Sequence, residues 1–252
     1  MRLPSPLRSR VAAAQNPDDD AGEGVPQDLR SFGRKRGRKL SPRGDGLLHD
    51  LLPRLSVDLG KPAGPAGDLC PRPFTDLWLE IGFGGGEHLL WQAAHNPNVL
   101  MLGCEPFVDG VVKVLGAVEA QSLANVRIHA DDARPLLRWL PAASIGRCFV
   151  LFPDPWPKRR HVKRRLISPT TLGLIARALR PEAELRIATD IGDYARTILL
   201  AIAATPELQW TAASAADWRR RPSDWPPTRY EAKAVREGRK RYFLTFRRSM
   251  DG

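Results

Sequence analysis

The sequence predicts an α/β fold in which a mostly parallel sheet is covered by helices on both faces. Two observations lead to this prediction. From Leu77 onward, short apolar segments of strand length alternate with longer segments of helical periodicity. In addition, glycine or acidic residues follow several of the apolar segments, at the sheet edge where open α/β folds bind their ligands.

Strands are expected where the chain stays apolar for a few residues and is then interrupted by glycine, proline or charged residues. The alternation of these short strands with helices implies a parallel sheet that is covered on both of its faces. The five segments are Leu77–Ile81, Val99–Cys104, Val126–Ala130, Cys148–Phe152 and Glu184–Ala188.

Helical patterns occupy the intervals between these strands. Ser168 directly precedes one of them and is expected to be its N-cap, because a serine hydroxyl accepts a hydrogen bond from a backbone amide of the first turn. The predicted helices are Glu87–His95, Phe107–Leu123, Pro135–Leu140 and Pro169–Leu179.

After these units, Asp193–Ala204 is expected to form a further helix and Leu208–Ala212 a further strand. A long basic loop should then lead to a last strand at Tyr242–Arg247. The sequence shows no internal repeat, so we expect one domain.

The N-terminal part has a different composition. Residues 1–46 are rich in Pro, Ser, Gly, Arg and Asp and have almost no aliphatic periodicity, so a disordered tail is expected. Its basic run Arg34–Lys39 is consistent with a segment that folds against RNA and equally with a solvated tail. An amphipathic helix at Leu47–Leu55 should begin a domain over residues 47–252, with a linker or surface loop at Gly60–Pro73.

The chain carries 39 Lys and Arg against 28 Asp and Glu, a net charge of +11. The basic residues are concentrated in residues 30–43, 158–165 and 219–248, and the rest of the chain is acidic. This segregation points to an anionic partner, either a nucleic acid or a membrane surface.

Cysteine usage and apolar runs exclude several classes of protein. Cys70, Cys104 and Cys148 are odd in number and form no C-x-x-C pair, which argues against a disulfide framework or a zinc site. Residues 1–15 lack the apolar core of a signal peptide, and no apolar stretch is long enough to span a membrane. We therefore expect a cytoplasmic protein without a membrane segment or a metal.

A glycine-rich segment follows the first predicted strand. The dinucleotide fingerprint G-x-G-x-x-G begun at Gly82 and Gly84 fails, because Glu87 stands at the third glycine position. A pyrophosphate would also be repelled by Glu80 and Glu87. A cationic ligand would not, and Glu80 could face the amino group or the sulfonium of S-adenosyl-L-methionine. The alternative is a tight glycine turn that binds nothing.

Acidic residues end the next two strands. Glu105 lies where such sheets place an acid on ribose hydroxyls. Asp132 could accept a hydrogen bond from an adenine amino group, with Asp131 as its alternative. Each acid alone is also consistent with an ordinary surface position, but acids at successive strand ends behind a glycine turn favour an adenosine-containing ligand.

The fourth strand leads into the most distinctive part of the sequence. Pro153, Pro155 and Pro157 stop the strand and stiffen the turn, because each proline fixes its own φ and restricts the residue before it. Asp154 is thereby held at the exit of the strand, and six of the eight residues in Lys158–Arg165 are basic. The alternative interpretation is a proline turn followed by a solvated basic helix start.

Together these residues resemble the bacterial tRNA (guanine-N7-)-methyltransferases, the TrmB family of class I S-adenosylmethionine-dependent enzymes. The resemblance runs from about Ser31 to Arg247, and the proline-flanked Asp-Pro-Trp-Pro-Lys run is its most specific part. The motifs that carry it are Glu80-Ile-Gly82-Phe-Gly84, Gly103-Cys-Glu105, Asp132-Ala133, Phe152-Pro-Asp154-Pro-Trp156-Pro-Lys158, Thr189-Asp190 and Thr228-Arg-Tyr-Glu231.

The resemblance implies a Rossmann-like class I methyltransferase fold, with a seven-stranded, mostly parallel sheet and an antiparallel last strand. It implies methyl transfer from S-adenosyl-L-methionine to N7 of a guanine in the variable loop of tRNA. A monomer or a homodimer is expected, since the family includes both.

The resemblance also assigns roles to individual residues. Asp154 would be the catalytic residue, and either Trp156 or Tyr230 could stack on the base. The cofactor would contact Glu80, Gly82, Gly84, Glu105, Asp132 and Asp154. The substrate nucleotide would contact Lys158, Asp190, Thr228, Arg229, Tyr230 and Glu231, and RNA would contact Arg160, His161, Val162, Lys163, Arg164 and Arg165.

One residue departs from the family pattern. Trp225 stands where an arginine is expected before the Pro-x-Thr of the last motif, which puts one RNA contact in doubt. Two other functions stay open at this point: a methyltransferase for another RNA or a small substrate, and a non-catalytic RNA-binding protein that keeps the fold.

Overall fold

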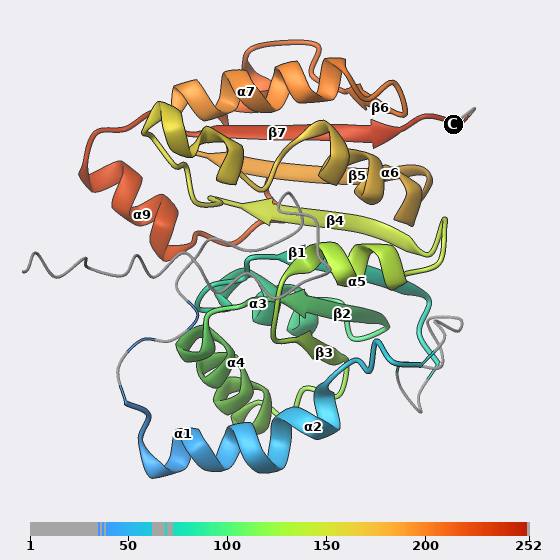
Figure 1. Cartoon of the computed structure of the whole chain (residues 1–252). Coiled ribbons are helices and arrows are strands. Elements are labelled where there is room, and N and C mark those ends of the chain that lie inside the picture. Colours follow the sequence, from blue (N-terminus) through green and yellow to red (C-terminus); the bar gives the residue numbers. More distant parts are fainter. Residues whose placement is uncertain (1–34, 36, 38, 62–68, 70–72, 251–252) are drawn as a thin grey trace, which may run out of the picture.

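The computed structural model describes residues 35, 37, 39–61, 69 and 73–250 (Figure 1). Most of the predicted tail, including most of the Arg34–Lys39 run, lies outside these residues, as do Cys70 and most of the predicted linker Gly60–Pro73. The described chain forms a central sheet with helices on both of its faces (Figure 1). The predicted fold class is confirmed.

The described residues form a seven-stranded sheet in the order β3-β2-β1-β4-β5-β7-β6, with β7 antiparallel to both of its neighbours. The other pairings are parallel, as the sequence predicts. The strands are β1 (Asp76–Ile81), β2 (Val99–Cys104), β3 (Val126–His129), β4 (Ile145–Leu151), β5 (Leu179–Thr189), β6 (Leu208–Trp210) and β7 (Tyr242–Arg248).

The strand order changes direction next to β1. From β1 the chain builds outward to β2 and β3, then crosses back to place β4 on the other side of β1. The connecting helices therefore lie on opposite faces of the sheet, and a crevice opens at the carboxyl ends of β1 and β4. This topology locates a binding site before any side chain is considered.

The helices agree with the predicted ones to within a few residues. Ser168 caps α6 through its hydroxyl, which accepts a hydrogen bond from Thr171 N at 3.2 Å, so the predicted N-cap is confirmed. The helices on the sheet are α3 (Glu87–His95), α4 (Val108–Ala120), α5 (Ala133–Trp139), α6 (Pro169–Ala178) and α7 (Gly192–Ala203), followed by α8 (Ala216–Arg219) and α9 (Arg229–Arg236).

The N-terminal boundary is a correction. A helix begins at Pro42 and continues through α1 (Pro42–Gly46), a π-helical segment (Leu47–Leu51) and α2 (Leu52–Leu55), so the predicted disorder is wrong over residues 42–46. Ser41 Oγ accepts from Gly44 N at 3.2 Å, and Pro42 fits the first turn because its missing N–H has no partner there anyway.

The predicted long basic loop before the last strand is also wrong in part, because it contains α8 and α9. Thr228 Oγ1 accepts from Glu231 N at 3.2 Å and so begins α9. The pattern Thr-x-x-Glu is a helix-start signature that the density of basic residues concealed.

The two faces of the sheet carry separate apolar cores, because successive strand residues point to opposite sides. Leu79 of β1 and Val150 of β4 pack toward α5, α6 and α7. Phe149 of β4 packs on the other side, against residues of α3, α4 and the segment that precedes α9. Glu80 lies between Leu79 and Ile81 and therefore points to the α3 side.

Gly110 of α4 lies directly behind the turn that follows β1. A Cβ at this position would be 2.2 Å from the carbonyl oxygen of Gly84. Gly110→Ala should push α4 and the turn apart and lower the free energy of unfolding by about 1–3 kcal/mol. Gly173→Ala in α6 is the control, since nothing lies within 4 Å of its Cβ, and it should be neutral or stabilising by up to about 1 kcal/mol. Urea unfolding measures both, and equal stability of the two variants would contradict the close contact.

Candidate active site

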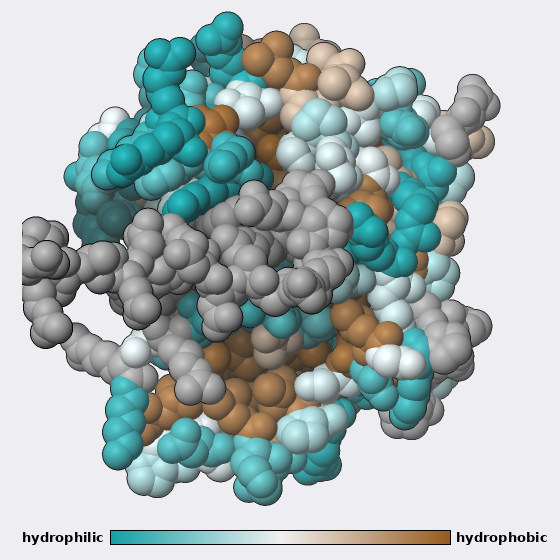
Figure 2. Space-filling model, in the orientation of Figure 1, coloured by the Kyte–Doolittle hydropathy of each residue, from teal (hydrophilic) through white to brown (hydrophobic). Residues whose placement is uncertain are grey.

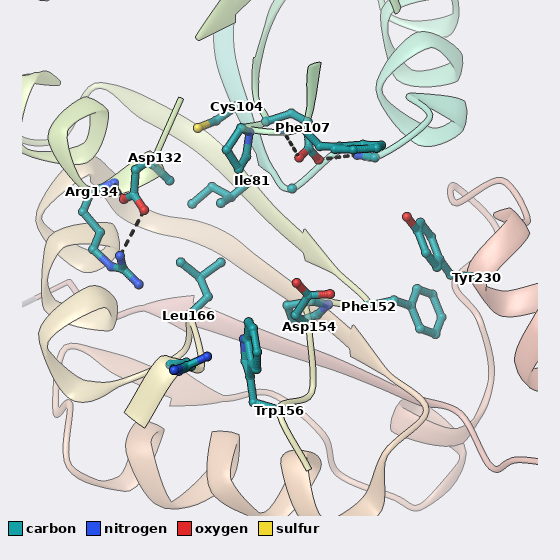
Figure 3. Close-up of a pocket in the computed structure, with 17 residues that line it drawn as sticks. Ile81, Cys104, Phe107, Asp132, Arg134, Phe152, Asp154, Trp156, Leu166 and Tyr230 are labelled. Atoms are coloured by element: carbon teal, nitrogen blue, oxygen red, sulfur yellow. Dashed lines mark hydrogen bonds and ion pairs between the residues drawn. The ribbon is translucent and has the colours of Figure 1, made fainter. Parts of the chain in front are cut away.

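A cleft of about 320 Å³ opens at the crevice that the topology creates (Figure 3). This volume is in the range of small-molecule binding sites. Its walls combine apolar side chains with three carboxylates and two guanidinium groups: Ile81, Gly82, Gly84, Cys104, Glu105, Pro106, Phe107, Asp132, Ala133, Arg134, Phe152, Pro153, Asp154, Trp156, Arg164, Leu166 and Tyr230.

The glycine turn after β1 forms one wall. Gly82, Gly84 and Gly86 have φ values of 75°, 56° and 80°, in the left-handed region that glycine adopts without strain. Gly82 and Gly84 line the cleft, and at these positions no side chain separates the backbone from a ligand. The predicted tight turn at the mouth of the sheet is present.

Glu105 follows β2 and holds this turn. Its carboxylate accepts hydrogen bonds from Gly84 N at 2.8 Å and from Phe107 N at 2.9 Å. A carboxylate offers about four acceptor positions, so about two remain for a ligand. Burial raises the pKa of Glu105 while the two amides oppose the rise. The arrangement is suited to accepting two hydroxyl protons, as a ribose diol would require.

The structure separates the two aspartates that the sequence left as alternatives. Asp132 lines the cleft and caps α5, with Oδ1 accepting from Arg134 N at 2.8 Å and Oδ2 paired with Arg134 Nη1 at 3.0 Å (Figure 3). Asp131 does not line the cleft and forms an exposed ion pair with Lys35 at 3.1 Å. Asp132 is thus the residue in position to contact a ligand.

Glu80 is not at the cleft wall. Because it points to the α3 side of the sheet, its carboxylate lies against His88, with Oε2 2.7 Å from Nδ1. Both side chains are almost fully buried. The structure therefore does not place the Glu80 carboxylate among the groups that line the cleft.

Asp154 stands on a strained turn at the end of β4. Phe152 and Trp156, two residues to either side, have positive φ values of 51° and 41°, which non-glycine residues rarely adopt. The Asp154 carboxylate is directed into the open space of the cleft (Figure 3). It forms no hydrogen bond or ion pair with any side chain in the described ranges, and loss of hydration raises its pKa.

The electrostatics of the cleft favour a cationic ligand. Glu105, Asp132 and Asp154 all have raised pKa values, and loss of hydration is the largest cause for each. Asp154 also raises the pKa of Glu105 by like-charge repulsion. A positive charge between these groups would relieve both the repulsion and the lost hydration.

The basic run after the proline turn forms a short 3₁₀-helix, Arg159–Arg164. Arg164 lines the cleft and lies 5.2 Å over the ring of Trp156. The Trp156 ring also meets His161 edge-on at 5.8 Å. Arg160 and Lys163 are exposed, as expected of residues that contact RNA.

Arg165 is a correction to the predicted set of RNA contacts. It is 4% exposed, and its guanidinium binds Pro155 O at 2.9 Å, Thr197 Oγ1 at 2.6 Å and Asp193 Oδ2 at 2.5 Å. It also lies 4.7 Å over the ring of Tyr194. Arg165 is therefore buried rather than offered to RNA, and its three hydrogen bonds fasten the proline turn to α7.

Tyr230 is the predicted substrate residue that reaches the cleft. It is 39% exposed, and its hydroxyl accepts a hydrogen bond from Arg229 at 3.3 Å. Arg229 is also 3.6 Å from Glu87. α9 therefore brings one aromatic ring to the edge of the cleft, next to the glycine turn.

The other predicted substrate residues lie around the cleft. Thr228 and Glu231 line a narrow gap beside Phe152, and Glu231 is paired with Arg221 at 3.2 Å. Asp190 is paired with Arg239 at 2.7 Å, and Lys158 is exposed.

Trp225, which stands where the family pattern has an arginine, is a buried side chain. It is 2% exposed and packs against Phe243 at 5.5 Å, so this position cannot contact RNA directly. Arg221, four residues earlier, donates to the carbonyl oxygen of Trp225 and pairs with Glu231. A guanidinium is thus present in this region, supplied from another position.

Several residues that line the cleft were not predicted from the sequence. Arg134 pairs with Asp132 in the first turn of α5, where a basic residue is unusual because of the helix dipole, and this was the available signal. Phe107 was assigned only to a helix start. Pro106 and Leu166 carried no signal of their own, since their place at the cleft depends on the fold.

In the described part of the chain, no group of three or more His, Cys, Asp or Glu side chains could hold a metal ion. Among the same residues, none of the helices has the length and apolar character needed to cross a membrane.

Comparisons with known proteins identify the family and the fold. A family model described as "Putative methyltransferase" matches residues 75–244. A tRNA (guanine-N(7)-)-methyltransferase of Nitrobacter hamburgensis is 45% identical, covering 97% of this chain and 94% of that protein. Those of Chelativorans sp. and Rhodospirillum rubrum are each 47% identical, covering 85% and 88% of this chain and 93% and 89% of those proteins. The crystal structure of the 16S rRNA methyltransferase KamB shares the fold at 17% identity, with a TM-score of 0.50 over 70% of this chain and 89% of that one.

The contrast between Arg165 and Arg160 is testable by unfolding. Arg165→Ala removes three hydrogen bonds from a charged donor, and we expect it to lower the free energy of unfolding by about 2–4 kcal/mol. Arg160→Ala should change it by less than about 0.5 kcal/mol, because the side chain is exposed. Urea denaturation of both variants measures the difference. A fully stable Arg165→Ala protein would contradict the anchoring role.

Proposed function

This chain belongs to the tRNA (guanine-N(7)-)-methyltransferase family, and on that premise we propose that it methylates N7 of a guanine in the variable loop of tRNA. The observation that carries the proposal is the Asp154 carboxylate, which stands unpaired among the described side chains on a strained turn at the edge of a carboxylate-lined cleft.

The cleft fits S-adenosylmethionine by its chemistry. The remaining acceptor positions of Glu105 suit the ribose hydroxyls, Asp132 suits an adenine amino group, and Gly82 and Gly84 allow close approach of the ligand. The excess of carboxylates over guanidinium groups suits a sulfonium. When bound, the cofactor supplies an electrophilic methyl group.

Methylation of guanine N7 requires little acid–base chemistry from the protein. N7 carries a lone pair and no proton in the neutral base, so no general base is required. Most of the rate must then come from orientation of the reactants, with electrostatic stabilisation second. Because the methylated guanine is cationic, the Asp154 carboxylate would stabilise the charge that develops on the ring.

The base would be held by the residues on and near α9. Tyr230 offers a partly exposed ring at the cleft for stacking, and the carboxylates of Glu231 and Asp190 could accept from guanine N1–H and the 2-amino group. A guanine in a folded tRNA must leave its stack to reach such a pocket, which costs a few kcal/mol. Binding of the tRNA backbone must offset this cost.

Exposed cations near the cleft would bind that backbone. Lys158, Arg160 and Lys163 surround the proline turn, with His161 and Val162 on the same short helix. Figure 2 shows hydrophilic residues at the upper left, where Figure 1 places α9 with its arginine and lysine residues. Such a surface should bind tRNA with an affinity that falls steeply with salt. We place the protein in the cytoplasm, where its tRNA substrate is found, and its state as monomer or homodimer stays a prediction.

A labelled-methyl assay tests the function directly. The protein is incubated with S-adenosylmethionine carrying a labelled methyl group and with unmodified tRNA, and the tRNA is then digested to nucleosides. Label should appear in N7-methylguanosine. Its absence there, or its appearance in another nucleoside, would refute the proposed substrate atom.

Asp154→Ala tests the catalytic carboxylate in the same assay. Loss of the group should slow methyl transfer by about 2–4 kcal/mol, roughly 30- to 1000-fold, if it stabilises charge as an oxyanion-hole donor does with opposite sign. tRNA binding should be nearly unchanged. Glu119→Ala is the control, because this carboxylate is exposed and does not line the cleft. Retained turnover in Asp154→Ala would remove Asp154 from the mechanism.

The pH dependence gives a separate test. The ionised carboxylate is the active form, and loss of hydration raises the pKa of Asp154 above its ordinary value. Single-turnover methylation should therefore be full above this raised pKa and decline as pH falls through it. Asp154→Asn, slow at every pH, should show a shallower acid decline, leaving only the contributions of Glu105 and Asp132. An acid limb identical to that of the wild type would contradict the assignment.

A further inference from the structure

Beneath the glycine turn lies a chain of buried polar side chains that the mechanism does not use. Glu80 is 2% exposed, and His88 and Gln92 are each 1% exposed. His88 Nδ1 lies 2.7 Å from Glu80 Oε2, and His88 Nε2 lies 3.1 Å from Gln92 Nε2. Gln92 Nε2 in turn donates to the carbonyl oxygen of Asp224 at 2.9 Å.

The hydrogen bond from Gln92 to Asp224 determines which atoms carry the protons in the other two contacts. A carbonyl oxygen can only accept, so the Gln92 atom near Asp224 must be the amide nitrogen. The same nitrogen faces His88 Nε2, which must then accept and carry no proton. His88 Nδ1–H consequently donates to Glu80, and a continuous chain of donors and acceptors runs from Glu80 to Asp224.

Aromatic rings hold His88 in this position from both sides. The ring of Phe149 meets the imidazole at 4.5 Å and 64°, and the ring of Trp225 meets it at 6.0 Å and 70°. The tryptophan that replaces the expected arginine is thus one wall of the His88 pocket. His88 is the one described residue that joins Glu80 of β1, Gln92 of α3, Phe149 of β4 and the Trp225 segment in these contacts.

The two ends of this hydrogen-bonded series, Glu80 and Asp224, belong to different halves of the site. Glu80 lies two residues before Gly82, which lines the cofactor side of the cleft. Asp224 belongs to residues 221–228, which carry Arg221, Trp225 and the cap of α9. The carboxylate of Asp224 ties this segment to β5 through Arg186 at 2.8 Å, and its carbonyl is the group that α3 holds.

We propose that His88 is a positioning residue that couples the glycine turn to residues 221–228, so that binding in the cofactor cleft orders the segment that leads into α9, where the guanine is held. The proposal rests on the function proposed above. Because the Glu80 carboxylate has His88 as its hydrogen-bonded partner, a shift of the turn on ligand binding moves the imidazole, and through Gln92 the Asp224 carbonyl. By linkage, a nucleotide whose binding orders residues 221–228 must tighten cofactor binding by the same factor.

A second contact between the two halves exists and must be separated from this one. Tyr230 of α9 packs directly on the turn, since a Cβ at Gly84 would lie 3.0 Å from its hydroxyl. The Tyr230 contact connects the turn to residues 229–236. The hydrogen bonds through His88 and Gln92 connect it to residues 221–228. The two routes therefore predict effects in different peptides.

Hydrogen–deuterium exchange of the full chain with S-adenosylhomocysteine as the probe distinguishes them. In the wild type, the probe should slow exchange at the glycine turn, in residues 221–228 and in residues 229–236. Gln92→Leu leaves the Glu80–His88 pair intact, and His88→Asn keeps a donor for Glu80 while losing the Nε2 acceptor. Both should keep protection at the turn but lose at least half of it in residues 221–228. Tyr230→Ala should lose protection in residues 229–236 and keep it in residues 221–228.

Thr205→Val is the control for a general loss of stability. It removes a buried hydrogen bond, from Thr205 Oγ1 to Ala201 O at 2.9 Å, at the end of α7, and should leave all three regions protected. As a kinetic readout, Gln92→Leu should raise the KM for tRNA about tenfold, a typical coupling factor, with kcat changed by less than about twofold.

Protection of residues 221–228 that is absent in the wild type, or unchanged in Gln92→Leu, overturns the proposal. If His88→Asn does not fold, Gln92→Leu still tests the coupling, because Glu80 keeps its hydrogen bond with His88 in that variant. The exchange measurement needs neither tRNA nor turnover. A failure of the coupling is therefore distinguishable from a failure of the proposed function, which would appear as missing label in N7-methylguanosine.

Discussion

The site depends on the Glu105 carboxylate, which accepts hydrogen bonds from Gly84 N and Phe107 N. These two bonds join the turn after β1 to the end of β2 and to the start of α4, so three segments are set by one side chain. They also leave the outer lone pairs of the carboxylate facing the cleft. Gly110 completes the arrangement, because only a residue without a Cβ lets α4 approach the Gly84 carbonyl. Glu105 therefore sets the shape of this wall of the cleft and also supplies one of its three carboxylates.

The opposite wall is held by a different means. The turn that carries Asp154 contains two residues of positive φ, Phe152 and Trp156, each of which is unfavourable by about 1–3 kcal/mol. Arg165 opposes this strain by binding Pro155 O from below and Asp193 and Thr197 on α7. Proline stiffness, backbone strain and a buried guanidinium together direct a carboxylate into the cleft without giving it a partner among the described side chains.

Much of this arrangement could be predicted from the sequence, because it follows from strand ends. Apolar runs located the strands, and parallel topology brings their carboxyl ends together, so Glu105, Asp132 and Asp154 meet at one cleft. The directions of individual side chains did not follow from the strand ends. Glu80 lies one residue from buried Leu79, and the period-two alternation of a strand sends it to the α3 face. Trp225 could not be interpreted from its motif position, because its burial depends on His88 and Phe243, which are distant in sequence. α9 was overlooked because its basic composition concealed a helix start at Thr228.

The basic run after the proline turn shows how local geometry divides one charge cluster among several tasks. A 3₁₀-helix has three residues per turn, so residues three apart share a face. Arg160 and Lys163 are both exposed, whereas His161 and Arg164 both contact the ring of Trp156. Arg165, at the end of the helix, is buried. An α-helical start would have grouped these residues at intervals of three and four and would have mixed the exposed cations with those that support the cleft. The tighter helix keeps them apart, which is why six basic residues within eight positions provide both a surface for an anionic partner and the internal support for Asp154.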